Sequence, residues 1–163
     1  MFRSPTMPAL GGRSGWIALA LAAVVCAASS VHAQAPQGQA VSNARVFPND
    51  GGMVLNFIKP DKTADFESVM AKVKEALMKS EKPERKQQAA GWKVFRSPDP
   101  AGANVLYVFI IDPSVKGADY QVSNIIAEAF PAAEATEILK KYAEAYAQGM
   151  NIVNLNVIQE FGK

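Results

Sequence analysis

The chain has 163 residues, with 17 Lys and Arg against 15 Asp and Glu, a single Cys and a single His. This length is enough for one ordinary domain with a hydrophobic core. Arg3 and Arg13 account for two of the basic residues, so the rest of the chain has as many acidic as basic side chains. It therefore has no basic excess of the kind that binds nucleic acid through counterion release.

The first 33 residues have the three features of a secretory signal peptide. Two arginines give a positive start, residues 16–28 form an apolar run, and Val31-His32-Ala33 places compact residues at a cleavage site. The run is shorter than the roughly 20 residues that a transmembrane helix needs. Val25, just before Cys26, fits a lipoprotein cleavage site poorly. We therefore expect cleavage near the end of this segment and a periplasmic or secreted protein that keeps no membrane span.

Cleavage there would remove both Cys26 and His32. Residues 34–163 would then have no thiol nucleophile, no histidine base and no Ser-His-Asp triad. They would also lack the imidazole and thiolate ligands that zinc, copper and haem use. No acidic cluster has the spacing of a calcium loop. The composition therefore predicts no metal and no cofactor.

Residues 34–52 are predicted to form a flexible lead-in, in which residues 44–48 could add a short strand, and residues 53–163 a single α+β domain. Apolar periodicity predicts the main elements of that domain. In chain order they are a strand at 53–59, a helix at 64–80, strands at 92–97 and 104–112, helices at 119–130 and 132–148, and a strand at 151–159.

The charged stretch 79–86 is predicted to be a solvated break around Pro83, followed by a short helix that Gly91 ends. The order strand, helix, strand, strand, helices, strand is the split arrangement of ferredoxin-like domains. It predicts an antiparallel sheet in which the third strand lies between the first two, with helices on one face. Because residues 53–59 and 151–159 carry apolar side chains on both faces, a single helical layer would leave one face uncovered.

Four segments within residues 53–160 carry this pattern: MVLNFIKPD, GWKVF, NVLYVFIIDP and NIVNLNVI. In these segments the chain resembles the dimeric α/β-barrel group, ferredoxin-like proteins that pair sheet to sheet. The segments match in pattern and order, without a signature motif. The resemblance implies a homodimer in which a second copy covers the other sheet face. The group includes cofactor-free monooxygenases, haem-dependent enzymes, isomerases and members with no known activity.

Five side chains are candidates for ligand binding: Asn56, Trp92, Arg96, Tyr107 and Asp112. By the resemblance, the first four would line a pocket between sheet and helices, where polar and aromatic groups hold the substrate of a cofactor-free oxygenase. Asp112 ends an apolar strand, where an acid is expected to lose solvent. Each of the five also has an ordinary structural interpretation. Asn56 would be a hydrogen-bonded amide, Trp92 a core indole, Arg96 a solvated arginine at a strand end, Tyr107 a packed phenol and Asp112 the residue that ends a strand.

Three functions follow from these patterns. The first is a non-catalytic exported homodimer that binds a small apolar molecule or a partner protein, favoured by the missing nucleophiles, bases and soft-metal ligands. The second is a cofactor-independent monooxygenase or isomerase, which rests on the resemblance alone. The third is a structural or interaction protein of the cell envelope, whose second sheet face meets a different protein.

Overall fold

The computed structural model describes residues 43–162, so the predicted signal segment lies outside the described residues. The described chain is α+β, with one antiparallel sheet of four strands and four α-helices. Its elements are β1 (Gly51–Ile58), the short 3-10 helix η1 (Pro60–Lys62), α1 (Thr63–Lys79), α2 (Pro83–Gly91), β2 (Trp92–Ala101), β3 (Asn104–Ile111), α3 (Val122–Ala129), α4 (Ala132–Ala145) and β4 (Asn151–Leu155).

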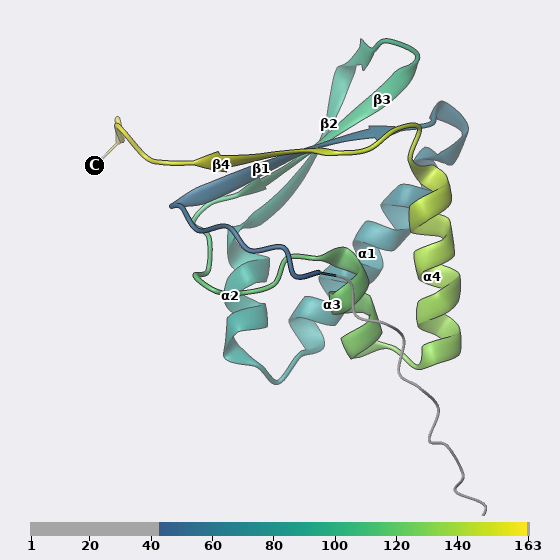
Figure 1. The fold of residues 1–163 in the computed structure, drawn as a ribbon, viewed down its shortest axis with the longest axis horizontal. Coiled ribbons are helices and arrows are strands. Elements are labelled where there is room, and N and C mark those ends of the chain that lie inside the picture. Colours follow the sequence, from purple (N-terminus) through teal and green to yellow (C-terminus); the bar gives the residue numbers. More distant parts are fainter. Residues whose placement is uncertain (1–42, 163) are drawn as a thin grey trace, which may run out of the picture. The chain divides into compact units, whose positions relative to one another are not determined.

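The strands lie in the order β2-β3-β1-β4, so β3 lies between β1 and β2, as predicted. Directly opposite residues of antiparallel strands project to the same face. Val54 lies opposite Phe109 and Asn56 opposite Tyr107, and all four are buried. These side chains form the sheet's half of the core, because the helices lie on this side of the sheet (Figure 1).

Helix α1 supplies much of the other half of the core. Phe66, Val73 and Leu77 recur at helical spacing and are all buried, as an amphipathic helix requires. The ring of Phe66 packs on the sheet, with its centroid 4.8 Å from that of Tyr107 and 6.1 Å from that of Phe109. The predicted helix over residues 64–80 is thus confirmed almost to the residue.

The opposite side of the sheet has no covering element among the described residues (Figure 1). The strand register places nine apolar side chains there. They are Met53, Leu55, Phe57, Phe95, Leu106, Val108, Ile110, Val153 and Leu155. We call this surface the open face. Phe95 is 51% exposed, and the six side chains from β1 and β3 are half-buried by their neighbours within the sheet.

The last two elements end earlier than predicted. Helix α4 ends at Ala145 because the chain turns there onto β1, where the backbone N–H of Ala147 donates to the carbonyl of Phe57 at 3.0 Å. Strand β4 ends at Leu155, which lies opposite Gly51, the first residue of β1. Beyond that point β1 offers no further partner, so the predicted strand over residues 151–159 is too long.

Of the predicted lead-in, residues 34–52, the structure describes residues from 43 on: residues 44–48 form no strand, Phe47 belongs to the core, and residues 51–52 already belong to β1. Phe47 is fully buried and packs edge-on against Tyr120, with ring centroids 5.4 Å apart. The backbone N–H of Arg45 donates to the Asp119 carboxylate at 2.7 Å, and the N–H of Gln121 donates to the same oxygen at 2.8 Å. Because Asp119 holds these loops together, helix α3 starts later than the predicted residue 119.

The predicted solvated break at residues 79–86 is wrong in its second half. Pro83 begins α2, where its missing N–H costs no helical bond. Arg85 is only 6% exposed, and its guanidinium donates to Gln88 (2.8 Å), to the Asp119 carbonyl (2.6 Å) and to Glu128 (2.9 Å). Arg85 thus connects α2 to the loop before α3, through Asp119, and to the end of α3, through Glu128.

Replacing Arg85 with Met is expected to lower the free energy of unfolding by about 2 kcal/mol, because the buried Gln88 oxygen would lose its donor. Lys86→Met is the control, since Lys86 is the exposed neighbour on α2 and a surface change of this kind stays within roughly 0.5 kcal/mol. Urea denaturation of both variants measures the difference. Equal stabilities of the two variants would contradict the anchoring role.

Candidate functional site

A cleft of about 540 Å³ opens between α1 and the start of β2, at the edge of the sheet. It exists because β2 is an edge strand, while the Phe66 ring of α1 packs on β3. The side of β2 that faces the helices is therefore only partly covered, and Val94 there stays 43% exposed. The volume lies within the range of about 300–1,000 Å³ that is usual for small-molecule sites.

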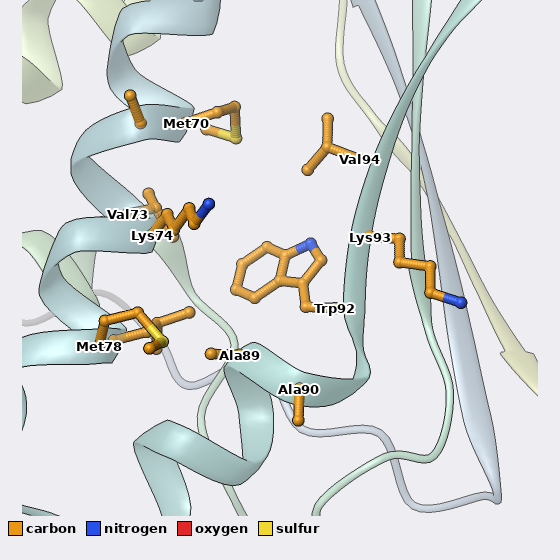
Figure 2. Close-up of a pocket in the computed structure, with 11 residues that line it drawn as sticks. Met70, Val73, Lys74, Met78, Ala89, Ala90, Trp92, Lys93 and Val94 are labelled. Carbon is orange, nitrogen blue, oxygen red and sulfur yellow. The ribbon is translucent and has the colours of Figure 1, made fainter.

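The wall of the cleft is mainly aliphatic, with one large aromatic ring (Figure 2). Helix α1 forms one side, the end of α2 closes one end, and β2 forms the other side. The main contributors are Met70, Val73 and Met78 from α1, Ala89 from α2, and Trp92 and Val94 from β2. The thioether side chains can adjust their shape to an irregular occupant.

Trp92 forms the inner wall. Its ring packs against Phe109 and Tyr120, with centroid separations of 5.5 and 5.6 Å. Its indole Nε1 is buried and has no hydrogen-bond partner among the described residues. In Figure 2 this nitrogen faces the space between Met70 and Val94. Leaving a buried donor unpaired costs about 1–3 kcal/mol, so the cleft contains one polar position that an acceptor would stabilise.

The charge in the cleft lining is positive, because it includes two lysines and no acid. Figure 2 shows the Lys74 ammonium on the cleft side of α1, whereas Lys93 points to the other side of β2. The Lys74 ammonium forms no ion pair or hydrogen bond with the described part of the chain. One unpaired ammonium and one unpaired indole N–H therefore face the same space.

Deeper in the core, Asn56 is held by a chain of hydrogen bonds. Its amide nitrogen donates to the carbonyls of Val54 (3.1 Å) and Tyr107 (3.2 Å), and its oxygen accepts from the Tyr146 hydroxyl (2.8 Å). The hydroxyls of Tyr146 and Tyr142 are 2.7 Å apart. A hydroxyl has one proton, so Tyr146 gives its proton to Asn56 and receives one from Tyr142. Asn56 thus has protein partners for both amide protons and for its oxygen.

Tyr107, Glu67 and Arg96 form a second polar group, between α1 and the middle of the sheet. The Tyr107 hydroxyl donates to the Glu67 carboxylate, and Arg96 donates to the same oxygen at 3.3 Å. Burial, followed by the hydrogen bond to Glu67, raises the pKa of Tyr107 to about 12. The side chains of Arg96 and Glu67 are 55% and 52% exposed, so their ion pair contributes at most about 1 kcal/mol.

The chain has four tyrosines, and all of them are expected to resist ionisation while the protein is folded. Burial is the largest cause in each case and raises the pKa of Tyr107, Tyr120, Tyr142 and Tyr146 above the ordinary value of 10.0. The native protein should therefore show little tyrosinate absorbance at pH 10, whereas the urea-unfolded chain is half ionised there.

The same shift makes the free energy of unfolding depend on pH. Because folding raises the pKa of these tyrosines, their ionisation is harder in the native protein than in the unfolded chain, so stability is lost once the unfolded chain can give up these protons. The free energy of unfolding should be unaffected by the tyrosines below pH 10 and should fall between pH 10 and about 12, where Tyr107 ionises. Urea titrations at several pH values test this, with Tyr107→Phe expected to reduce the slope. A native tyrosinate midpoint at or below that of the unfolded chain would contradict it.

Of the five candidates from the sequence, Trp92 is the one that lines the cleft. The register places Arg96, Tyr107 and Asn56 opposite one another in a row across three strands, further along the sheet. Arg96 pairs with Glu67 at the surface, whereas the polar atoms of Tyr107 and Asn56 are bonded inside the protein. The first four candidates are therefore not brought together around this cleft.

Asp112 is exposed, so the expected loss of solvent at this acid is wrong. Strand β3 ends at Ile111, and the backbone N–H of Asp112 donates to the carbonyl of Gly91 at 2.9 Å, whereas its carboxylate has no partner among residues 43–162. The carboxylate lies outside the core because the chain leaves the sheet toward Pro113.

Sequence reasoning missed the α1 side of the cleft. Met70, Lys74 and Met78 are four residues apart and so share one face of α1, beside the core stripe. Met70 packs against the core as well as lining the cleft, so its helical spacing alone does not distinguish the two roles. Met78 could have indicated this surface, because it is an apolar side chain that lies outside the core stripe of the helix. In the structure it is 56% exposed.

A scan against protein-family models, a search of curated proteins and a search of solved structures return no match to this chain. Within residues 43–162, no three His, Cys, Asp or Glu side chains gather in a way that could hold a metal ion. In the same part of the chain, no helix has both the length and the apolar composition to cross a bilayer. The assignment of a function thus depends on the cleft and on the open face.

Proposed function

We propose that this chain is an exported, non-catalytic binding domain that takes up a small apolar molecule in the cleft between α1 and β2. The cleft is the observation that carries the proposal. It has the volume of a small-molecule site, a mainly aliphatic wall and a single buried polar group without a partner. Export rests on the composition of residues 1–33.

We further propose that the domain is ferredoxin-like and pairs through the open face with a second copy, as in the dimeric α/β-barrel group. The strand order β2-β3-β1-β4 and the helices on one side of the sheet support this arrangement. A second copy is the favoured partner because it presents the same apolar surface, and two-fold homodimers are the commonest assemblies. The cleft lies on the helix side of the sheet, so this pairing would leave it accessible.

The ligand proposal is tested with N-phenylnaphthylamine, a neutral fluorophore whose emission rises in apolar sites. The native chain should bind it with saturable enhancement, and Val94→Lys should weaken binding about tenfold by placing an ammonium in the cleft. Ile152→Lys is the control, since Ile152 is 49% exposed on β4, the opposite edge strand. No saturable binding, or equal binding by Val94→Lys, would reject the cleft as an apolar site.

A further inference from the structure

We infer that the molecule taken up by this cleft is an amphiphilic carboxylate, with an aliphatic body and one anionic head group. This inference rests on the proposed function of the cleft and narrows its ligand by chemical class. It starts from the two unpaired polar groups that face the cleft, the indole of Trp92 and the ammonium of Lys74.

Both groups can only donate hydrogen bonds. An indole N–H has no acceptor lone pair, and a protonated lysine has none either. The lining contains no acidic side chain that could accept from them. A pure hydrocarbon would leave both donors unpaired, and a ligand with an amine would place a second cation beside Lys74. A carboxylate supplies two acceptor oxygens, enough to pair with both donors at once.

The two donors come from opposite walls of the cleft (Figure 2), and we expect a single head group to lie between them. The indole nitrogen opens into the space between Met70 and Val94, and Lys74 is one helical turn beyond Met70 on α1. The walls formed by Met78 and Ala89 remain for the aliphatic body. Aliphatic ligands suit this part of the lining because, apart from the indole and the lysine ammonium groups, the cleft wall consists of alkyl and thioether groups.

The two donors are expected to contribute unequally. Lys74 is exposed, so salt and water screen its attraction for an anion. The indole nitrogen is buried, so an acceptor reaches its N–H only when a neighbouring side chain such as the adaptable Met70 moves aside. A charged acceptor then gains more there than in water and removes an unsatisfied donor. We expect the head group to improve affinity about tenfold overall, of which Lys74 supplies a factor of about three.

Three probes with the same alkyl chain test the head group: decanoate, decanol and decyltrimethylammonium, each used below its micellar concentration to displace N-phenylnaphthylamine. Decanoate should bind about tenfold more tightly than decanol, and the cation most weakly. Lys74→Met should weaken decanoate about threefold and leave decanol unchanged. Lys86→Met is the control, since Lys86 is an exposed lysine on α2 outside the cleft lining. It should change neither the affinity for decanoate nor that for decanol.

The indole itself gives a direct readout in the unmodified chain. The Nε1–H resonance of Trp92 is assigned as the one lost in Trp92→Phe, and decanoate should move its proton to higher frequency more than decanol does. Equal affinities for decanoate and decanol, or an indole resonance that decanoate does not move, would overturn the carboxylate while leaving the cleft as a neutral apolar site. Absence of fluorophore binding would instead reject the proposed function itself.

Discussion

Replacing Gly52 with alanine is expected to lower the free energy of unfolding by about 3 kcal/mol or more, the range of a severe core defect. A Cβ at this position would lie 2.0 Å from Cδ1 and 2.2 Å from Cε1 of the Phe47 ring. Phe47 is fully buried, with its ring packed edge-on against Tyr120, so it has no free space into which to move. The added methyl group would displace the ring from the core.

Gly149→Ala is the matched control, because a Cβ at Gly149 would meet no atom within 4 Å. Its stability should stay within about 0.5 kcal/mol of the native value. Gly52→Ala should also cost far less in a Phe47→Ala background, where the ring is gone, and a double-mutant cycle measures that coupling. If Gly52→Ala destabilises both backgrounds equally, Phe47 is not packed on β1 as described.

Neither Phe47 nor Arg85 could be placed from the sequence, for related reasons. Phe47 belongs to no helix or strand, so no periodicity marks it, and its burial depends on the space left above a glycine of β1. Arg85 lies in a charged stretch that local composition assigns to solvent. It is buried because a carbonyl and a carboxylate from residues 119 and 128 meet it there. Such contacts become visible only after distant segments have been brought together.

The regular elements were more predictable because a single segment contains their signal. The helix expected at 64–80 is observed at Thr63–Lys79, and the strand expected at 104–112 at Asn104–Ile111. In both, burial repeats with the period of the element. The sequence did not predict the ends of elements that depend on a partner segment. Strand β4, for example, ends where its partner β1 begins. Local patterns predict which face is apolar, and neighbouring strands decide where pairing stops.

The candidate site was predictable to a smaller extent. Trp92 could be singled out as an aromatic residue that opens a strand, and it does line the cleft. Its neighbours on α1 could not be recognised, because an apolar helical stripe does not reveal which of its turns lies over an uncovered edge strand. The side chains of Asn56 and Tyr107 look available for a ligand in the sequence. Their hydrogen bonds to other parts of the chain become apparent only in the fold.

The open face leads to the second large expected effect: Val108→Lys should convert the proposed dimer into a monomer. Val108 lies at the middle of this surface, opposite Leu55 on one side and Phe95 on the other. If two copies pair through this face, a two-fold axis brings the two introduced ammonium groups into one apolar interface. Burying unpaired charges there is strongly unfavourable, so association should be lost at micromolar concentration.

Size-exclusion chromatography with light scattering measures this change in mass, and circular dichroism checks that the variant keeps its fold. Val108 faces away from the helices, so the substitution should leave the core of the single copy intact. Ile152→Lys is the control and should remain dimeric, because Ile152 lies opposite Val54 and so projects to the other face. A native chain that is already monomeric at micromolar concentration would contradict the pairing.

Thermal unfolding gives an independent view of the same interface. A dimer that unfolds to separate chains has a midpoint that rises with protein concentration, whereas the midpoint of a monomer does not. The native chain and Ile152→Lys should show this dependence, and Val108→Lys should not. If Val108→Lys dissociates the protein while N-phenylnaphthylamine still binds, the open face and the cleft act separately. If Val108→Lys abolishes both dimerisation and N-phenylnaphthylamine binding, pairing helps to shape the cleft from the far side of the sheet.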